Sequence, residues 1–209
     1  PDAWQAVLAA NNPPPPLTLR VSGDRAAYLA ELSEAGIEAE AHPLVATAVT
    51  LGEFRPVASL PGFAEGRASV QDAAAQLAAP LLDPRPGQRV LDACTAPGGK
   101  LAHLLTQTPD LDVTALDADP HRLERTRETL ERTGVAPKGL LTGDAAIPET
   151  WWQGEPFDRI LMDAPCSGTG VIRRHPDIKH LRRPADLGLM RERQQAMLEA
   201  LWPLLRPGG

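Results

Sequence analysis

The first third of the chain contains short stretches in which hydrophobic and polar residues alternate. Leu17, Leu19 and Val21 alternate with polar residues, which is the period of a strand. Two more short strands are expected over residues 48–51 and 67–70. Several short strands this close together predict a small sheet.

Two helices are predicted around these strands. Asp24 is a typical N-terminal cap of the first helix, and Gly36 is a typical stop. The second helix is expected over residues 71–82, ended by Pro84. We therefore predict a small α+β unit over residues 1–80, including a stiff proline-rich linker. The residues expected to share one face of the first helix are Ala26, Leu29, Ala30 and Leu32.

Beyond Asp83 the pattern changes to strands that alternate with helices, which predicts a parallel sheet covered by helices. The strands are expected over residues 89–91, 113–116, 139–142 and 157–162, and the helices from Lys100 onward and over 119–133. Each strand is followed by an acidic residue, and the carboxyl ends of parallel strands share one edge. The acidic residues expected to cluster there are Asp92, Asp117, Asp144 and Asp163.

A turn of small residues joins the first of these strands to its helix. It runs from Thr95 to Gly99 and has no side chain larger than threonine, so a ligand can approach its backbone. Ligands bind at such strand ends in open α/β sheets. The alternative is a turn whose glycines serve only tight packing.

The spacing around this turn favours a nucleoside cofactor. Asp117 follows Gly98 by roughly 20 residues, the spacing at which an acidic residue binds a ribose in nucleotide-binding folds. Both the dinucleotide fingerprint and the P-loop are missing from the sequence. S-adenosylmethionine has one adenosine, no phosphate and a cationic tail, which matches a ring of carboxylates. We therefore predict a Rossmann-like S-adenosylmethionine-dependent methyltransferase sheet over residues 81–209, with a small N-terminal α+β appendage.

Pro165 and Cys166 follow the fourth strand of this sheet. Cytosine C5 is too weak a nucleophile to take a methyl group directly. A thiolate that adds at C6 activates C5, and loss of the C5 proton after methyl transfer expels the thiolate. A cysteine at this strand end therefore indicates cytosine chemistry, unless it is only a small residue packed in a loop.

The net charge of −6 argues against a protein that binds nucleic acid through bulk charge. Residues 173–183, however, carry five cations and one anion directly after the Pro-Cys loop. We expect this run to contact phosphates rather than to be only a solvated face, and we expect unpaired RNA because the target base must be unstacked. The predicted RNA contacts are Arg173, Arg174, His175, Lys179, Arg182 and Arg183.

The composition of the chain indicates the cellular compartment in which we expect the protein. Two cysteines are too few for a disulfide framework, which fits a reducing compartment. The first residues lack the pattern of an export signal, and no apolar run in the sequence approaches the roughly 18 residues of a membrane span. We therefore expect a cytoplasmic location without membrane association. His175 and His180 form no metal-ligand pattern with their neighbours, so no metal is predicted.

These motifs resemble those of the Sun/Nop family of RNA cytosine-5 methyltransferases. The similarity runs from about Pro14 to Gly209 and is carried by residues 63–77, 92–100, 116–134, 143–145 and 157–183. The resemblance implies methylation of cytosine C5 in RNA by S-adenosylmethionine, with small-subunit ribosomal RNA as the substrate. It also implies that the α+β unit binds RNA.

The resemblance places the family's functional residues on this sequence by motif. Asp117 corresponds to the ribose-binding acid, Asp144 to the adenine-side acid, and Asp163 to the acid before the Pro-Cys pair. Asp163 and Cys166 are the catalytic residues that it implies here, with Cys166 assisting product release. The cofactor loop falls on Cys94, Thr95, Ala96, Pro97, Gly98, Gly99 and Lys100.

The sequence departs from the family pattern at both ends. The family's nucleophile is a cysteine in a Thr-Cys sequence after a Pro-Gly-Gly turn, and the chain stops at such a turn, residues 207–209. The all-helical domain that precedes this region in close relatives is also missing. We therefore expect a fragment that is inactive on RNA alone, with its fourth strand at an apolar edge. The alternatives are a noncatalytic RNA-binding module that retains the cofactor fold and a methyltransferase for a protein or small molecule. A Thr-Cys sequence after Gly209 would favour the RNA cytosine-5 methyltransferase, and its absence would favour the noncatalytic module.

Overall fold

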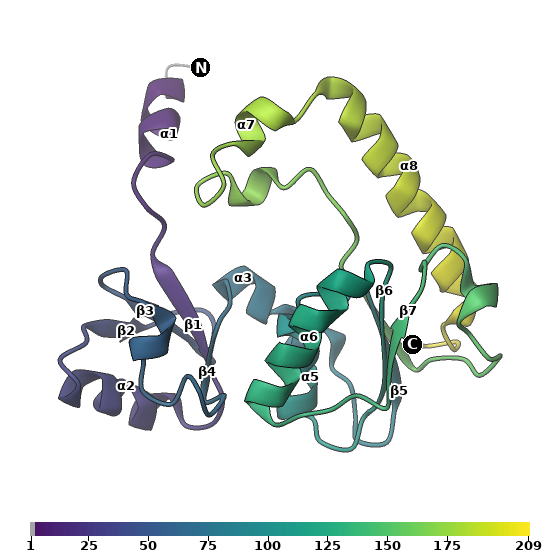
Figure 1. The fold of residues 1–209 in the computed structure, drawn as a ribbon, viewed down its shortest axis with the longest axis horizontal. Helices are drawn as coiled ribbons and strands as arrows, with labels where there is room; N and C mark the ends of the chain where they lie inside the picture. The colour runs from purple at the N-terminus through teal and green to yellow at the C-terminus, as the bar shows by residue number, and fades with distance from the viewer. Residues whose placement is uncertain (1–2) are drawn as a thin grey trace.

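A computed structural model describes residues 3–209 of the chain. It contains two four-stranded sheets, one antiparallel and one parallel, which lie side by side in Figure 1. The α/β fold with a small N-terminal appendage is thus confirmed. The first two residues of the predicted α+β unit lie outside the described residues.

The antiparallel sheet has the strand order β2-β3-β1-β4. The predicted strands correspond to β1 (Leu17–Val21), β3 (Ala48–Leu51) and β4 (Ala68–Val70). The sequence pattern missed β2 (Ala39–Ala41) and the helix α1 (Trp4–Ala10). Both are short and largely exposed, and neither is long enough for its pattern to identify it.

Helix α2 (Arg25–Glu34) covers one face of this sheet. As predicted, the Asp24 carboxylate caps it by accepting hydrogen bonds from two backbone amides. The predicted buried face is partly wrong, because Ala26 and Ala30 are exposed, whereas Tyr28 and Leu32 are buried. The larger side chains decide which face packs, since they remove more apolar area from water.

The helix predicted over residues 71–82 is two short helices, α3 (Ala73–Gln76) and α4 (Ala78–Leu82). Pro80 explains the break, because its ring would clash with the carbonyl of Gln76 in a continuous helix. A new helix that begins at Ala78 places Pro80 in its first turn, where proline is tolerated. The break turns α4 toward the second unit, to whose core it contributes Ala79.

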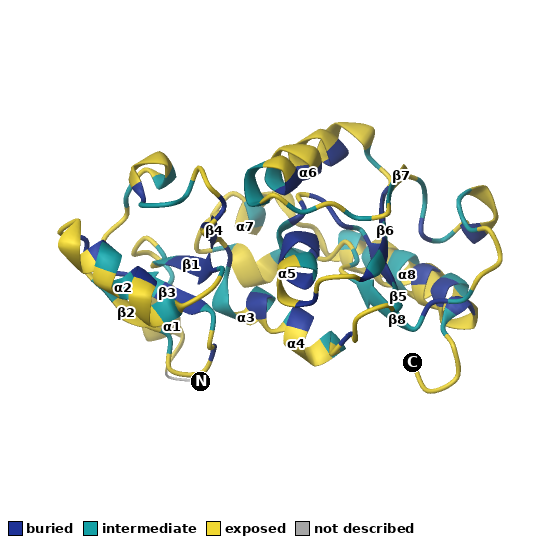
Figure 2. Ribbon diagram, turned by 90° about the horizontal axis from the view of Figure 1, so that it is seen from below, coloured by how far each residue is buried: buried dark blue, intermediate teal, exposed yellow. Residues whose placement is uncertain are grey.

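The parallel sheet has the strand order β7-β6-β5-β8, so β8 lies beside β5. Helices α5 (Gly99–Gln107) and α6 (Pro120–Thr133) pack against one face. Figure 2 shows that the strands themselves hold much of the buried part of this unit. The strands are β5 (Arg89–Ala93), β6 (Asp112–Asp117), β7 (Gly139–Thr142) and β8 (Arg159–Met162).

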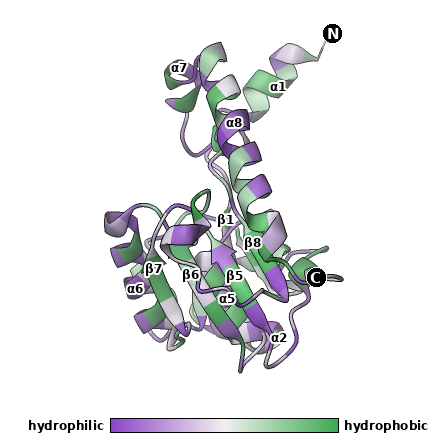
Figure 3. Cartoon of the chain, turned by 90° about the vertical axis from the view of Figure 1, so that its right-hand side faces the viewer, coloured by the Kyte–Doolittle hydropathy of each residue, from purple (hydrophilic) through white to green (hydrophobic). Residues whose placement is uncertain are grey.

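The chain leaves the sheet after β8 and returns to it along a long helix. This segment contains α7 (Ile178–Leu181) and α8 (Pro184–Leu201), and Figure 3 shows α8 rising away from the sheet. Only the end of α8 is packed, through the buried Met197 and Leu201. As expected, β8 is an edge strand of the described sheet, and its side chains are half-buried.

Arg132 of α6 links the two units through hydrogen bonds and an aromatic contact. Its guanidinium donates hydrogen bonds to the carbonyls of Phe63 and Ala68 at 2.7 and 2.9 Å, and to the Ser69 hydroxyl at 2.8 Å. It also lies over the Phe63 ring, 4.3 Å from the centroid. These contacts hold the antiparallel unit at a fixed place beside the parallel sheet.

Candidate functional site

The small-residue turn is held from two sides. The backbone N–H of Ala96 donates to the Asp117 carboxylate at 3.1 Å, which ties the turn to the end of β6. From α6, the Arg122 guanidinium donates to the Ala96 carbonyl at 2.8 Å and the Thr129 hydroxyl to the Pro97 carbonyl at 2.9 Å. The turn is therefore fixed before any ligand binds.

The two glycines of the turn have different roles. Gly98 has a φ of +91°, and a Cβ there would lie 2.9 Å from the Thr126 side chain. This glycine therefore allows both the left-handed backbone conformation and the close packing of the turn against α6. A Cβ on Gly99 would meet no atom within 4 Å. The packing explanation therefore holds for Gly98, while Gly99 faces open space.

A cleft of about 390 Å³ opens beside Gly99. Most of the predicted cofactor loop lines it, from Cys94 to Pro97 together with Gly99 and Lys100. Asp163 closes one side and forms an ion pair with Lys100 at 2.5 Å. Gln71 and Asp72 of the antiparallel unit also line the cleft, which therefore lies between the two units.

Asp92 is the most buried acid of the cleft, with 1% of its surface exposed. It lies one residue before the end of β5, whereas the sequence predicted that the strand finishes at this acid. One carboxylate oxygen accepts from the Thr95 hydroxyl at 2.7 Å, and the other has no partner among the described residues. Burial raises the pKa of Asp92 to about 7. A buried acceptor without a partner at the base of a cleft is available to a ligand.

Asp117 and Asp144 lie at the same edge of the sheet as Asp163, although neither lines the 390 Å³ cleft. The buried Asp117 carboxylate also accepts from the backbone N–H of Asp119 at 3.1 Å. Asp144 forms an ion pair at 2.6 Å with Arg193 of α8, which lowers the pKa of Asp144. The acids thus converge at one edge as predicted, but each has its own protein partners.

Sequence reasoning missed Arg193 and Arg122 as parts of this site. Arg193 lies about fifty residues from Asp144 in the chain, so only the return of α8 to the sheet brings them together. Arg122 lies 3.5 Å from Asp117 and follows the capping residue of α6, where a charged side chain gave no distinct signal. The Arg193 contact is a long-range consequence of the packing, whereas the Arg122 contact is local.

The two cysteines differ in accessibility and chemistry. Cys94 is half-buried, and burial with the nearby Asp117 carboxylate raises the pKa of its thiol to about 11. Cys94 is thus a protonated, weakly nucleophilic thiol at neutral pH. Cys166 is exposed on the loop after β8 and does not line the cleft beside Gly99.

The predicted RNA contacts lie on the exposed segment after β8, but three of them have partners within the chain. Arg173 donates to the carbonyls of Pro13 and Pro14 at 3.0 and 3.2 Å, Arg174 pairs with Asp72 at 2.7 Å, and Arg182 donates to the Ser167 carbonyl at 2.7 Å. The side chains of His175 and Lys179 are exposed and have no hydrogen-bond partner among the described residues. Arg183 is exposed at the start of α8.

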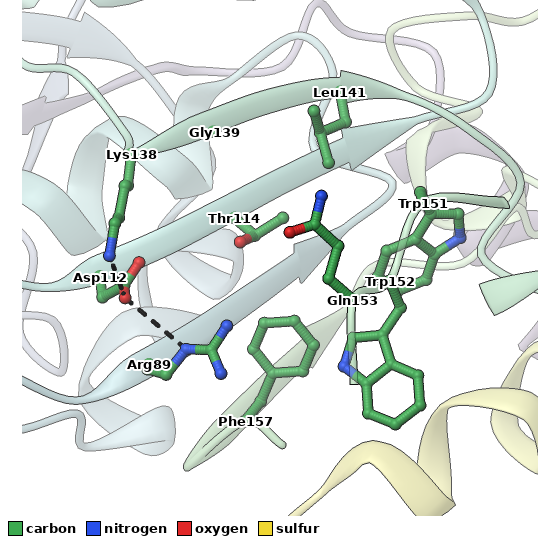
Figure 4. Close-up of a pocket in the computed structure, with 10 residues that line it drawn as sticks. All are labelled: Arg89, Asp112, Thr114, Lys138, Gly139, Leu141, Trp151, Trp152, Gln153 and Phe157. Atoms are coloured by element: carbon green, nitrogen blue, oxygen red, sulfur yellow. Dashed lines mark hydrogen bonds and ion pairs between the residues drawn. The ribbon is translucent and has the colours of Figure 1, made fainter. Parts of the chain in front are cut away.

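A second cavity of about 390 Å³ lies along the parallel sheet, from the starts of its strands to Trp151 (Figure 4). Trp151, Trp152 and Phe157 form one side of it. At the strand starts, Asp112 lies 2.8 Å from Lys138 and 3.6 Å from Arg89. Trp151 donates a hydrogen bond to the Asp144 carbonyl at 2.8 Å, but none of residues 94–100 lines this cavity, so we do not assign the cofactor to it.

Residues 3–209 also bear on two other kinds of site, a membrane span and a metal centre. None of the helices in this range combines the length and apolar character that crossing a bilayer requires. Within the same residues, no group of three or more His, Cys, Asp or Glu side chains is arranged to hold a metal ion.

Comparison with known proteins places the chain in a family. The model of the 16S rRNA methyltransferase RsmB/F family matches residues 79–209, and that of an RsmF/B-like ferredoxin-like domain matches residues 1–58. The ribosomal RNA small subunit methyltransferases B of Vibrio cholerae and Pseudomonas syringae are 51% and 53% identical over the whole chain, which covers 49% and 47% of their lengths. The chain thus spans about half the length of these curated relatives.

Two solved structures share the fold of the chain. A methyltransferase homologue from Pyrococcus horikoshii is 30% identical over 96% of this chain and 64% of its own, with a TM-score of 0.81. NSun6 from Pyrococcus horikoshii, solved with SFG, shares the fold with a TM-score of 0.82 at 18% identity, over 100% of this chain and 79% of its own. The family match covers well over half of the chain and confirms the resemblance inferred from the motifs. The chain belongs to the 16S rRNA methyltransferase RsmB/F family.

Proposed function

We propose that this chain is the cofactor-binding part of an enzyme that transfers a methyl group from S-adenosylmethionine to cytosine C5 in small-subunit ribosomal RNA. Family membership and the names of the relatives support the proposal. The observation that carries it is the cleft beside Gly99. Its lining combines open glycine backbone, the Lys100–Asp163 ion pair and the unpaired buried carboxyl oxygen of Asp92.

The residues around the cleft fit S-adenosylmethionine. This cofactor supplies a methyl group from a sulfonium centre, and its positive charges favour nearby carboxylates. We assign the backbone of residues 95–99, with Lys100, to its methionine end. Asp117 is assigned to the ribose hydroxyls, Asp144 to the adenine side, and Asp163 to the region of the transferred methyl group and the target base.

The methylation of cytosine C5 needs a thiolate. Its sulfur forms a bond to C6, C5 then takes the methyl group, and removal of the C5 proton breaks the carbon–sulfur bond. The raised pKa of Cys94 argues against that residue as the nucleophile. We assign the exposed Cys166 to assist the elimination step, and we expect the nucleophilic cysteine after Gly209.

The RNA is expected to bind along the segment after β8. His175, Lys179 and Arg183 are exposed there and are assigned to phosphates. Arg173, Arg174 and Arg182 shape the same segment through their contacts within the chain, and are assigned to RNA as well. A ribosomal RNA substrate would place the protein in the cytoplasm.

Two measurements test the proposal. The first is calorimetric titration of the purified chain with S-adenosylmethionine, for which we expect one binding site and affinity at least about tenfold weaker in Asp117→Ala, since hydrogen bonds to a charged group are lost. The second is incubation of the intact gene product with the cofactor and small-subunit ribosomal RNA, followed by chromatographic analysis for 5-methylcytosine. RNA binding without cofactor binding would favour the noncatalytic alternative instead.

A further inference from the structure

Three neighbouring cavities lie between the cofactor cleft and the antiparallel unit, and we call them together the groove. The cleft beside Gly99 shares Asp72, Val171 and Arg174 with a middle cavity of about 230 Å³. The middle cavity shares Pro15, Pro16 and both arginines, Arg173 and Arg174, with an outer cavity of about 550 Å³. Arg174 lines all three, so the cavities adjoin one another.

The outer cavity combines apolar walls with positive charge. Its walls include Pro14, Leu17, Phe54 and Val70, and no acidic residue lines it, whereas Arg173 and Arg174 do. In the middle cavity the one acid, Asp72, is already paired with Arg174. An anionic strand can therefore pass along the groove without meeting an unpaired carboxylate in these two cavities.

The groove is preformed rather than adaptable. The two hydrogen bonds from Arg173 to the carbonyls of Pro13 and Pro14 hold the proline-rich linker against the segment after β8. Consecutive prolines have fixed φ angles, so this wall loses little freedom when a ligand binds. The third guanidinium nitrogen of Arg173 has no hydrogen-bond partner among the described residues and is available to a phosphate.

Phe54 is the feature of the outer cavity that the fold does not explain. It lies in the loop after β3, and 78% of its surface is exposed. Phe54 is not part of the core of the antiparallel unit, so its side chain contributes little to packing. An exposed aromatic ring beside arginines is the arrangement on which unpaired bases stack in proteins that bind single-stranded nucleic acid.

We propose that the outer cavity is a nucleobase-stacking subsite for single-stranded RNA, in which a nucleotide near the target base stacks on Phe54 while its phosphates contact Arg173 and Arg174. The subsite rests on the proposed function, because its strand is the one that delivers the target base to the cofactor cleft. It gives the antiparallel unit a defined role in holding the substrate.

The test compares matched variants by fluorescence anisotropy with a labelled unstructured RNA of about twelve nucleotides, a length within the range that aromatic grooves bind. Phe54→Ala should weaken binding about tenfold, because stacking on one base is lost. Phe54→Trp should keep the affinity. Leu44→Ala is the control, since Leu44 is 85% exposed on the same unit but does not line the groove. Thermal unfolding of each variant checks that the fold is intact.

A photoreactive pyrimidine in the same RNA provides a second readout. We expect cross-links to the loop that contains Phe54, mapped by mass spectrometry, and their loss in Phe54→Ala. If the wild-type chain binds the RNA but Phe54→Ala binds it equally well, the stacking subsite is refuted and the proposed function stands. If the wild-type chain binds no RNA, both the subsite and the RNA part of the proposed function are contradicted, while cofactor titration still reports on the methyltransferase site.

Discussion

Lys100 and Asp163 are joined by an ion pair of 2.5 Å across the mouth of the cleft beside Gly99. Lys100 lies in the first turn of α5, and Asp163 directly follows β8. The pair thus links the two elements that bound the proposed cofactor site. The side chains are 25% and 52% exposed, so the pair is solvated and its contribution to stability is small.

Lys100→Met is therefore expected to lower the affinity for the cofactor while changing the stability of the fold little. The free energy of unfolding should fall by less than about 1 kcal/mol, the usual range for a solvated ion pair. The affinity for S-adenosylmethionine should fall at least about fivefold, because Lys100 lines the cleft and orients Asp163. Denaturant unfolding and calorimetry measure the two effects. Equal affinity in the variant would count against the assignment of Lys100.

The buried carboxyl of Asp92 predicts a pH-dependent difference in stability. The pKa of Asp92 is about 7 in the folded chain, whereas its ordinary value is 3.8. Between these two pH values the folded state therefore holds a proton on Asp92 that the unfolded state has lost. Its contribution to stability is therefore fully present below about pH 4 and is lost as the pH rises through 7.

Asp92→Asn removes this titration. Without cofactor, the variant should be more stable than the wild type at pH 8, by up to about 4 kcal/mol from the size of the pKa change, and close to it at pH 4. Urea unfolding at both pH values gives the comparison. A difference that does not change between pH 4 and 8, or a variant that is less stable at pH 8, would contradict the burial of an unpaired carboxyl.

Arg132 is expected to be the main polar link between the two units. Arg132→Met removes three hydrogen bonds and the contact with the Phe63 ring, and should lower the free energy of unfolding by about 2–4 kcal/mol. Arg127→Met on the same helix is the control, because Arg127 pairs only with Glu124 on the surface and should cost less than about 1 kcal/mol. Similar losses in both variants would mean that Arg132 does not fasten the units.

The cysteines should react at very different rates. At pH 8, iodoacetamide is expected to modify the exposed Cys166 first, while Cys94 remains a protonated thiol because burial raises its pKa to about 11. Mass spectrometry of digested protein measures each rate, and Cys166→Ser should remove the fast reaction. Faster labelling of Cys94 would show that its thiol is not protected as described.

The parallel sheet was predictable because its signals are local. Strands such as residues 113–116 are short apolar runs, and α6 has a capping acid, Asp119, and a Gly134 stop. The fold of the loop at Thr95–Gly99 follows from the same local signals. The break at Leu77 was missed because the apolar period continues through Pro80, and only the geometry of proline separates the two helices.

The partners of the site residues could not be predicted from the sequence. The contacts of Asp144 with Arg193 and of Arg174 with Asp72 each join segments far apart in the chain, so they depend on where α8 and the segment after β8 pack. The sequence also could not show that Asp92 lies within its strand with a free oxygen, because a one-residue difference in strand length decides it.

The most direct test of the cofactor site is a calorimetric titration of S-adenosylmethionine into the wild-type chain and Gly99→Val. A Cβ at Gly99 would meet no atom of the surrounding elements within 4 Å, and Gly99 lines the cleft, so a side chain there should block the ligand without disturbing the fold. We predict one-site binding to the wild type and none to Gly99→Val, with an unchanged melting temperature. Absence of binding to the wild type, or equal affinity in a folded Gly99→Val chain, would contradict the site.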